Sequence, residues 1–514
     1  MTRNMTNNMT NNMTRDDNRG HLSRRGFVQR AAGTGLAVAA AVGAAGATAA
    51  AGLLTGCSSD EEDELASTVA NEAGSEANIT TLDVATGQIL ETTDFDEAPL
   101  ADYLVEGPSW ELTMGTQVFQ ASASTALLLQ PADVGEDLVG FALLNLDDGT
   151  ITSLFKKPVG LGVNDILYDA RASETSLIWV ELNLASQDWR VYVAPMETIL
   201  TVVAEVTTQR EAAKGPLSPE RVAREAAEAQ AAAQAIAQVA QLVEEGNADY
   251  EAPMLAISGD KAYWTVMPNP DGPASTEDSY LKAVQVRPPG SFAEPQTVHT
   301  SHGRMITTPL ISGDLITIVP RVDTESIYYQ LTAITVLSNQ IRHVDILPQS
   351  LRVTDAVFLG DNFAFCIEDN YDYAKGLATF GTYLGLPDGT YLHVNRIPTS
   401  APVMIDGLLF VKSTMNAVCF DVTNHRYFAV KAVADCVDYG DVLAGWGVQN
   451  RLVLYTSVPN HENSSKSKTV LRVFDRPAPP EPEVEEGAEE GAEGSTDGSA
   501  GSESATTEVQ TPTD

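Results

Sequence analysis

The chain has 514 residues, with 31 Lys and Arg against 70 Asp and Glu, and its formal net charge is −39. This charge excludes a general affinity for nucleic acid phosphates or anionic membrane surfaces, because like charges repel. Hydrophobic residues make up 43% of the chain, enough for a sizeable core, and 38 Gly with 26 Pro indicate frequent turns rather than a helical bundle.

Residues 1–57 carry two motifs typical of export. Arg24 and Arg25 precede an Ala- and Gly-rich apolar run, which ends in the sequence Leu54-Thr55-Gly56-Cys57. The paired arginines resemble a twin-arginine (Tat) signal peptide, and the last four residues resemble a lipoprotein box whose cysteine receives the lipid. The resemblance implies an extracytoplasmic protein anchored to the membrane by lipid at Cys57. A transmembrane helix is the alternative, but Ala and Gly contribute little transfer energy.

Two acidic flanks have the composition of disordered chain. Residues 58–76 hold seven acids and no base, and residues 477–514 hold eleven acids and no base. Such segments bury too little apolar surface to offset their ordering entropy. We therefore expect an acidic flexible tether at 58–76, a folded body at 77–476 and a disordered acidic tail at 477–514.

The body contains a repeated pattern of a short apolar run, a turn and a second apolar run. Four clear copies place glycines 54, 47 and 47 residues apart, at Gly259, Gly313, Gly360 and Gly407. Weaker copies lie at 119–129, 168–180 and 442–455, and Asp148-Gly149 and Asp388-Gly389 suggest a second hairpin per unit. Two hairpins per period of about 47 residues predict the four-stranded blade of an all-β propeller. Seven blades fit best, six or eight also fit, and a β-sandwich is the main competitor.

The ends of the body bear on how the ring closes. Residues 78–90 have the pattern of an outer hairpin, and 469–474 is the last strand. A ring leaves no exposed edge if N-terminal strands complete the C-terminal blade. We expect that closure.

One insertion interrupts the repeat, because Glu174 and Gly259 lie 85 residues apart. Ser218-Pro219 is a good helix start and Gly246 a good stop, which predicts one long α-helix within an insertion at about 209–248. A seam of mostly small residues follows 4-3 spacing at Val222, Ala226, Ala229, Ala233, Ile236, Ala240 and Val243. This seam either packs on the propeller itself or forms a docking arm for a partner.

Few residues of the mature chain suggest catalysis. His299 and His302 are a close pair, but their β-rich context does not favour a metal site. The acidic loops 271–278 and 368–372 could gather carboxylates around calcium, although neither has the spacing of a known calcium loop. Cys366, Cys419 and Cys436 are expected to be buried thiols, with a Cys419–Cys436 disulfide as the alternative.

Tryptophans are the other candidates for a binding site. Trp179 and Trp264 occupy regular blade positions and are expected in the core. Trp446, between Gly445 and Gly447, is the candidate ligand-binding residue.

The strands at 177–181 and 189–193 resemble blades of TolB-like and related extracytoplasmic bacterial propellers. The resemblance implies a fold more than a task. The sequence therefore favours a non-catalytic, lipid-anchored propeller that binds a protein, peptide or glycan and no nucleic acid. The alternative is an enzyme that uses the central channel, either a polysaccharide-cleaving propeller or a quinone- or metal-dependent oxidoreductase.

Overall fold

The computed structural model describes residues 69, 77–82, 89–131, 140–160, 162, 164–208, 219–272, 275–322, 328–347, 351, 353–367, 380–396, 398–412, 416–433, 442–443, 451–460 and 467–477. Arg24, Arg25, Cys57, Cys436 and Trp446 lie outside these residues, as do the loop 368–372 and the tail from residue 478. The predictions for them stay predictions. No helix within the described ranges is long and apolar enough to cross a bilayer.

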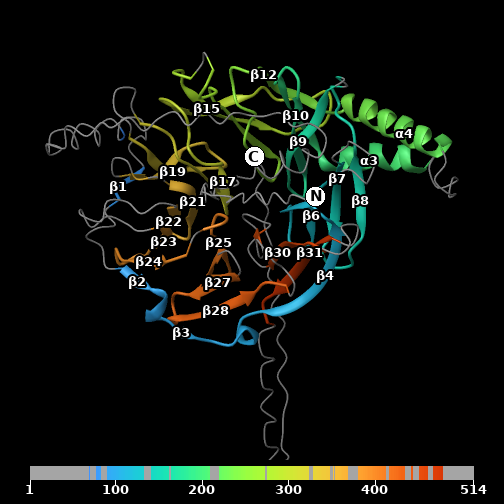
Figure 1. Ribbon diagram of the computed structural model, residues 1–514. Helices are drawn as coiled ribbons and strands as arrows, with labels where there is room; N and C mark the ends of the chain where they lie inside the picture. The colour runs from blue at the N-terminus through green and yellow to red at the C-terminus, as the bar shows by residue number, and fades with distance from the viewer. Residues whose placement is uncertain are drawn as a thin grey trace, which may run out of the picture. The chain divides into compact units, whose positions relative to one another are not determined.

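The described strands form seven sheets arranged as the blades of a β-propeller, each with an antiparallel core of four strands (Figure 1). Blade 1 holds β5 (Gln117–Gln120), β6 (Thr125–Gln130), β7 (Gly140–Asn145) and β8 (Ile151–Phe155). Blade 2 holds β9 (Asp165–Ala172), β10 (Ser176–Asn183), β11 (Trp189–Pro195) and β12 (Gln241–Gly246). Blade 3 holds β13 (Leu255–Ser258), β14 (Lys261–Val266), β15 (Ser279–Gln285) and β16 (Gln296–Ser301).

The second half of the ring repeats this arrangement. Blade 4 holds β17 (Leu310–Ser312), β18 (Leu315–Ile318), β19 (Gln330–Thr335) and β20 (Ile341–Ile346). Blade 5 holds β21 (Val353–Leu359), β22 (Asn362–Ile367), β23 (Gly381–Gly385) and β24 (Tyr391–Val394). Blade 6 holds β25 (Val403–Ile405), β26 (Leu408–Lys412), β27 (Asn416–Asp421) and β28 (Arg426–Lys431). Blade 7 holds β29 (Val442–Leu443), β30 (Arg451–Val458), β31 (Lys468–Asp475) and β4 (Val105–Thr113).

The seven apolar repeats of the sequence are the inner hairpins of the seven blades, so the predicted propeller is confirmed. The four repeat glycines occupy the turns and adopt φ between 54° and 76°, a left-handed conformation that glycine reaches without a steric penalty. The second hairpin is also confirmed where Gly149 and Gly389 turn at φ 76° and 82°. Each blade therefore follows from local turn chemistry and a period-2 apolar pattern.

The N-terminal segment forms a belt that closes the ring. The prediction of an outer hairpin at 78–90 is wrong, because β1 (Asn78–Thr81), β2 (Ile89–Glu91) and β3 (Asp96–Glu97) each add a fifth, parallel strand to a different blade. They pair with β20, β24 and β28 at the rim of the ring (Figure 1). Two short 3-10 turns connect the strands of this segment: η1 (Thr92–Asp94) lies between β2 and β3, and η2 (Leu100–Asp102) lies between β3 and β4. β4 then pairs with β31, which confirms the expected closure of the last blade.

The chain is already packed on blade 4 before the belt begins. Val69 is 1% exposed and lies in an apolar cluster with Val322, Val344 and Ile346. The expected tether at 58–76 therefore contains at least one residue that is anchored on the propeller.

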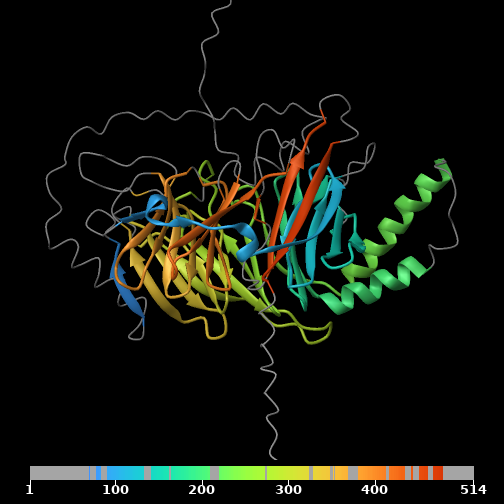
Figure 2. The same cartoon turned by 90° about the horizontal axis from the view of Figure 1, so that it is seen from below.

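The insertion consists of two helices rather than one in the described chain, α3 (Met196–Thr208) and α4 (Pro219–Ala237), which leave the ring between β11 and β12 (Figure 2). Pro219 begins α4 as predicted, but the helix ends at Ala237. Residues 241–246 form β12 instead, because they complete blade 2 by pairing with β11. Local helix propensity here yields to strand pairing.

The base of this helical hairpin packs on its own propeller. Ile199 of α3 and Ile236 of α4 are fully buried in a cluster with Phe155 of blade 1 and Trp179 of blade 2. Ala223, Arg224 and Ala226, further out on α4, are exposed. Packing on the propeller is thus confirmed for the base of the hairpin.

Candidate functional site

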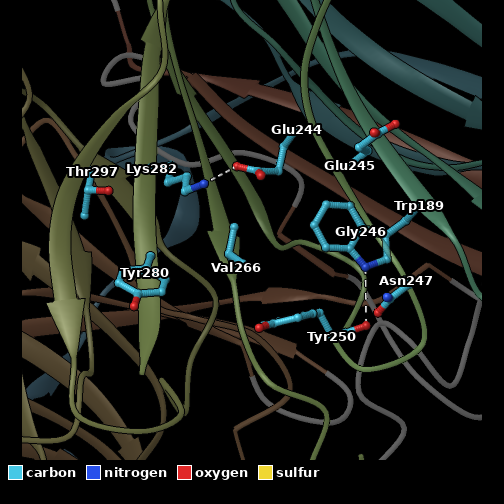
Figure 3. Close-up of a pocket in the computed structure, with 10 residues that line it drawn as sticks. All are labelled: Trp189, Glu244, Glu245, Gly246, Asn247, Tyr250, Val266, Tyr280, Lys282 and Thr297. Atoms are coloured by element: carbon cyan, nitrogen blue, oxygen red, sulfur yellow. Dashed lines mark hydrogen bonds and ion pairs between the residues drawn. The ribbon is translucent and has the colours of Figure 1, made fainter. Parts of the chain in front are cut away.

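A groove lined by residues of blades 2 and 3 has a volume of about 510 Å³ (Figure 3). Small-molecule and peptide sites typically have volumes of this order. The groove is lined by β11, β12 and the following loop on one side and by β14, β15 and β16 on the other, through Trp189, Glu244, Glu245, Gly246, Asn247, Tyr250, Val266, Tyr280, Lys282 and Thr297.

The blade 3 wall of the groove is a set of cross-strand neighbours. Lys282 of β15 lies opposite Trp264 of β14 and Thr297 of β16. Tyr280 lies two residues along β15 from Lys282, opposite Val266. Because alternate residues of a strand share one face, these side chains all face blade 2. The pleat therefore places an aromatic ring and a cationic group side by side.

A β-bulge in β12 places an acid on the opposite wall. Val191 pairs with Glu244, but Tyr192 pairs with Leu242, so Val243 is an extra residue in the ladder. A bulge re-aims the neighbouring side chain. Val243 packs in the apolar cluster between blades 2 and 3, and Glu244 faces the groove.

Glu244 connects the two walls electrostatically. Its Oε2 lies 2.5 Å from Lys282 Nζ and accepts a hydrogen bond from Trp264 Nε1 at 3.2 Å. The side chains of Lys282 and Glu244 are 26% and 19% exposed, so the ion pair is partly shielded from water yet reachable from the groove. Such a pair offers both a donor and an acceptor to a polar ligand.

Tyr250 and Trp189 both line the groove and are linked by a hydrogen bond. Trp189 Nε1 donates to the Tyr250 carbonyl at 3.3 Å, and the Tyr250 hydroxyl donates to Glu277 Oε2 at 2.5 Å. The hydrogen bond to the Glu277 carboxylate raises the pKa of Tyr250. Gly246 lies against the Trp189 indole, and a Cβ at this position would lie 2.2 Å from the ring. The glycine that the sequence suggested as a helix stop is thus required for packing in β12.

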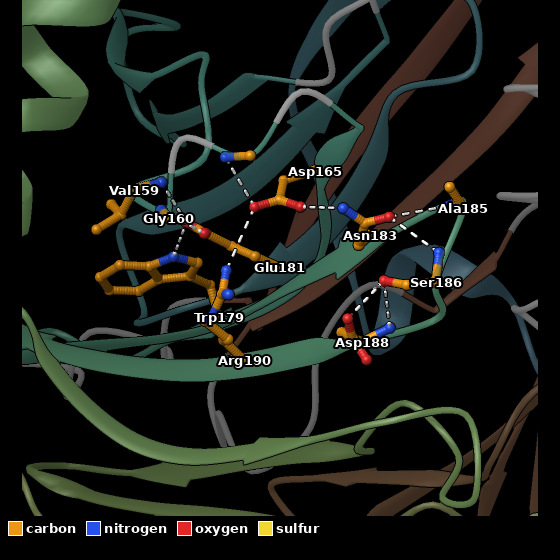
Figure 4. A network of polar contacts seen from close by, with 11 residues as sticks. Val159, Gly160, Asp165, Trp179, Glu181, Asn183, Ala185, Ser186, Asp188 and Arg190 are labelled. Atoms are coloured by element: carbon orange, nitrogen blue, oxygen red, sulfur yellow. Dashed lines mark hydrogen bonds and ion pairs between the residues drawn. The ribbon is translucent and has the colours of Figure 1, made fainter.

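A polar network in blade 2 fixes the loop that enters this blade (Figure 4). The Glu181 carboxylate accepts hydrogen bonds from Val159 N at 2.5 Å, Gly160 N at 2.8 Å and Trp179 Nε1 at 3.2 Å. Its burial raises the pKa of Glu181. Arg190 lies 3.3 Å from the nearby Asp165. These contacts stabilise the fold, since each polar group is bonded within the network.

A smaller cavity, of about 150 Å³, lies at the inner hairpin turns of blades 1 to 4. Arg171 lines it from β9, with its guanidinium 4.0 Å from the centre of the Phe119 ring. The same guanidinium lies 2.5 Å from Asp169 and donates to the Ala170 carbonyl at 2.6 Å. Arg171 is therefore bonded to two residues of its own strand, β9.

The tryptophans, the histidine pair and the acidic loop can be placed. Trp179 and Trp264 are fully buried, which confirms their assignment to the core. Burial, with a smaller contribution from the charge of His302, lowers the pKa of His299 to about 4. In the loop 271–278, Glu277 binds Tyr250 and Asp278 lies 3.6 Å from His302. Among the described residues no cluster of three or more His, Cys, Asp or Glu could hold a metal ion.

Cys366 and Cys419 are buried thiols, as the first interpretation of the cysteines predicted. Burial raises the pKa of Cys419 well above its usual value. The alternative disulfide involves Cys436, which lies outside the described residues.

Among known proteins, the chain is similar to solved structures only. No family model matches the chain, and no curated protein matches it significantly. A prolyl endopeptidase structure matches with 14% identity and a TM-score of 0.42, over 74% of this chain and 48% of that chain, so the present chain spans about half of that enzyme's length. The propeller domain of the trilobed protease from Pyrococcus furiosus matches with 9% identity and a TM-score of 0.41, over 70% and 97% of the two chains. BamB from Moraxella catarrhalis matches with 11% identity and a TM-score of 0.35, over 72% and 99%. Matches with identities and TM-scores this low carry no conclusion about activity, substrate or partner.

Sequence patterns did not reveal the groove. Its walls come from residues of two blades, and Glu244 was assigned to the end of a helix. Trp189, Tyr250 and Tyr280 line the groove but lie far apart in the sequence, so no short segment pointed to it.

Proposed function

We propose that this chain is a lipid-anchored extracytoplasmic β-propeller that acts as a non-catalytic binding or scaffold protein, with the groove between blades 2 and 3 as its ligand site. The observation that carries the proposal is the composition of the groove. Tyr250 and Tyr280 provide aromatic surface, and Glu244, Asn247 and Lys282 provide donors and acceptors of hydrogen bonds. Aromatic surface with a few polar groups suits a peptide or glycan chain.

The groove can be tested by filling it. Thr297 is exposed on the wall of the groove, so Thr297→Trp should block the site without disturbing the core. Thr201→Trp, at an exposed position on α3, is the matched control because it adds the same side chain far along the chain from the groove. We expect ligands selected from a glycan array or a peptide library to lose affinity for the first variant and keep it for the second. Equal binding to both variants would place the ligand elsewhere.

The non-catalytic role makes a separate prediction about the bound chain. A ligand incubated with the protein should be recovered with unchanged mass. A shortened or oxidised product, formed in proportion to the amount of protein, would contradict the binding role and favour the channel enzyme.

The lipid anchor is supported by the motifs of residues 1–57. Labelled fatty acid should enter the wild-type protein and not a Cys57→Ser variant. Replacement of Arg24 and Arg25 by Lys should retain the protein in the cytoplasm. Labelling of the Cys57→Ser protein, or export of the Lys–Lys variant, would refute the respective assignment.

A further inference from the structure

The charged groups of the groove leave it with an excess of negative charge. Lys282 Nζ is bonded to Glu244 Oε2 at 2.5 Å, so these two charges largely compensate each other. Glu245 also lines the groove, and it forms no ion pair within the described part of the chain. The Tyr250 hydroxyl binds a further carboxylate, that of Glu277. Because opposite charges attract, the groove favours a ligand that carries positive charge.

One carboxylate oxygen in the groove is available to a ligand. Lys282 and Trp264 both donate to Glu244 Oε2, whereas Oε1 accepts no bond from any residue that the structure describes. The Glu244 side chain is 19% exposed, so a ligand can reach Oε1 from the groove. A hydrogen bond from a cationic donor to a carboxylate is roughly twice as strong as one between neutral groups. Oε1 therefore suits a cationic group.

Two tyrosine rings offer a second contact for such a group. Tyr250 and Tyr280 line the groove, and neither ring stacks on another aromatic ring of the described chain. Tyr280 lies two residues from Lys282 on β15 and therefore on the same face of the strand. The face of an aromatic ring attracts a cation. Rings beside a carboxylate suit the side chain of lysine or arginine.

The strand that carries Glu244 has an open edge in the described chain. β12 is the last strand of blade 2, and only β11 pairs with it. In blades 4, 5 and 6 the last strands, β20, β24 and β28, each pair with one further strand, β1, β2 or β3. These added strands have four, three and two residues. A short extended segment is thus enough to add a strand to a blade of this propeller.

The end of β12 beside the groove is long enough for such a segment. Beyond the bulge at Val243, residues 244–246 pair in order with residues 189–191 of β11. Glu244 faces the groove, so a strand added at this edge would place one of its side chains directly beside Glu244 (Figure 3). Opposite charges at neighbouring positions stabilise strand pairing. A glycan lacks the ladder of N–H and C=O groups that an open strand edge binds.

We propose that the ligand of the groove is an extended peptide segment of a partner protein. It pairs with residues 244–246 of β12 as a fifth strand of blade 2 and places a lysine or arginine side chain against Glu244 Oε1. This inference rests on the proposed function of the groove and narrows its ligand to a basic peptide. Lys282 is then a resident cation that competes with the ligand for Glu244.

Synthetic peptides added to the full chain test the charge of the ligand. Each pool holds linear peptides of Val, Thr and Ser with one fixed position, which is Lys or Arg in the basic pool, Gln in the neutral pool and Glu in the acidic pool. We expect the basic pool to bind roughly tenfold more tightly than the neutral pool, as for one charge-assisted hydrogen bond, and the acidic pool to bind least. Preference for the neutral or acidic pool, or failure of every pool to bind, would overturn the inference.

Methylation of the peptide backbone tests the added strand. Only alternate N–H groups of an added strand point toward the edge that it joins. Methylation of one alternate set of nitrogens should therefore abolish binding of the basic peptide, and methylation of the other set should spare it. Equal effects of the two sets, or tighter binding of a glycan from an array, would contradict strand pairing.

Two substitutions on the walls of the groove should act in opposite directions. Glu244→Gln keeps an acceptor for Trp264 but removes the charge, so the basic peptide should bind roughly tenfold more weakly. Lys282→Gln removes the competing cation, so the same peptide should bind more tightly. Glu174→Gln, at an exposed turn of the same blade, is the matched control and should leave affinity unchanged. Unchanged binding to Glu244→Gln, or weaker binding to Lys282→Gln, would refute the contact.

Thr297→Trp separates this inference from the proposed function. If this variant loses the basic peptide, both are supported. If it loses a neutral peptide or a glycan that the wild-type protein prefers, the groove is the ligand site and only the basic-peptide inference fails. If it keeps full affinity for the basic peptide, the groove is not the ligand site and both fail.

Discussion

The buried carboxylate of Glu181 allows a quantitative prediction about the stability of blade 2. Glu181 is 2% exposed, and its two oxygens divide three donors between them. Oε1 accepts from Val159 N and Trp179 Nε1, and Oε2 accepts from Gly160 N. Val159 and Trp179 are buried, whereas Gly160 is exposed and can donate to water.

Two substitutions should therefore differ in a defined way. Glu181→Ala leaves two buried donors without an acceptor, at about 2 kcal/mol each, so it should lower the free energy of unfolding by about 4 kcal/mol. Glu181→Gln retains Oε1 and loses only the bond to the exposed Gly160 amide, so the loss should be about 1 kcal/mol. Glu174→Gln, at an exposed turn of the same blade, should change stability by less than about 0.5 kcal/mol.

The contribution of Glu181 to the free energy of unfolding should depend on pH with a definite sign. Burial raises the pKa of Glu181, so the folded state holds its proton more readily than the unfolded state. The contribution of Glu181 to stability is therefore fully present below the unfolded pKa and is lost as pH rises through the folded pKa. Glu181→Gln should remove this component of the pH dependence.

Urea unfolding followed by tryptophan fluorescence measures these differences, because the Trp179 indole is bonded to Glu181. Equal midpoints for the Ala and Gln variants would refute the assignment of donors to the two oxygens. A wild-type component that strengthens with rising pH, and disappears in Glu181→Gln, would refute the role given to burial.

Three other predictions follow from the same contacts. Gly246→Ala should lower the free energy of unfolding by about 1–3 kcal/mol, measured in urea, because its Cβ would overlap the Trp189 ring; an unchanged midpoint would contradict this packing. His299 should oppose folding in acid, because its lowered pKa makes stability fall as pH drops from about 6.5 toward 4; His299→Gln should flatten this slope in urea titrations, and an unaltered slope would argue against it. Cys366 and Cys419 should resist alkylation in the native protein and react on unfolding, as peptide mapping would show; native labelling would mean that these thiols are accessible.

The sequence determined the blades because their signals are local. The sequence signal of each inner hairpin spans about a dozen residues and consists of two apolar runs around a turn. The four repeat glycines mark turn positions where φ is positive. The repeat then implies a ring, since each blade buries its faces against its neighbours. Closure of the last blade by an N-terminal strand could also be predicted, because a closed ring leaves no exposed sheet edge.

The tertiary structure decided the belt and β12, since neither carries a sufficient local signal. β1, β2 and β3 have four, three and two residues and exist only through parallel pairing with strands more than 250 residues away. β12 follows an Ala-rich helix in the chain and contains two glutamates, yet pairing with β11 fixes it as a strand.

The groove, like the belt, was decided by the tertiary structure and not by local sequence. The sequence offered Trp446 as a candidate, from its flanking glycines alone. The structure brings Glu244 and Lys282 together from two blades, and this requires a bulge in β12 as well as the ring that sets the blades face to face. Local periodicity specifies which residues share a face of one sheet, but contacts between blades depend on ring closure, which no short window of sequence contains.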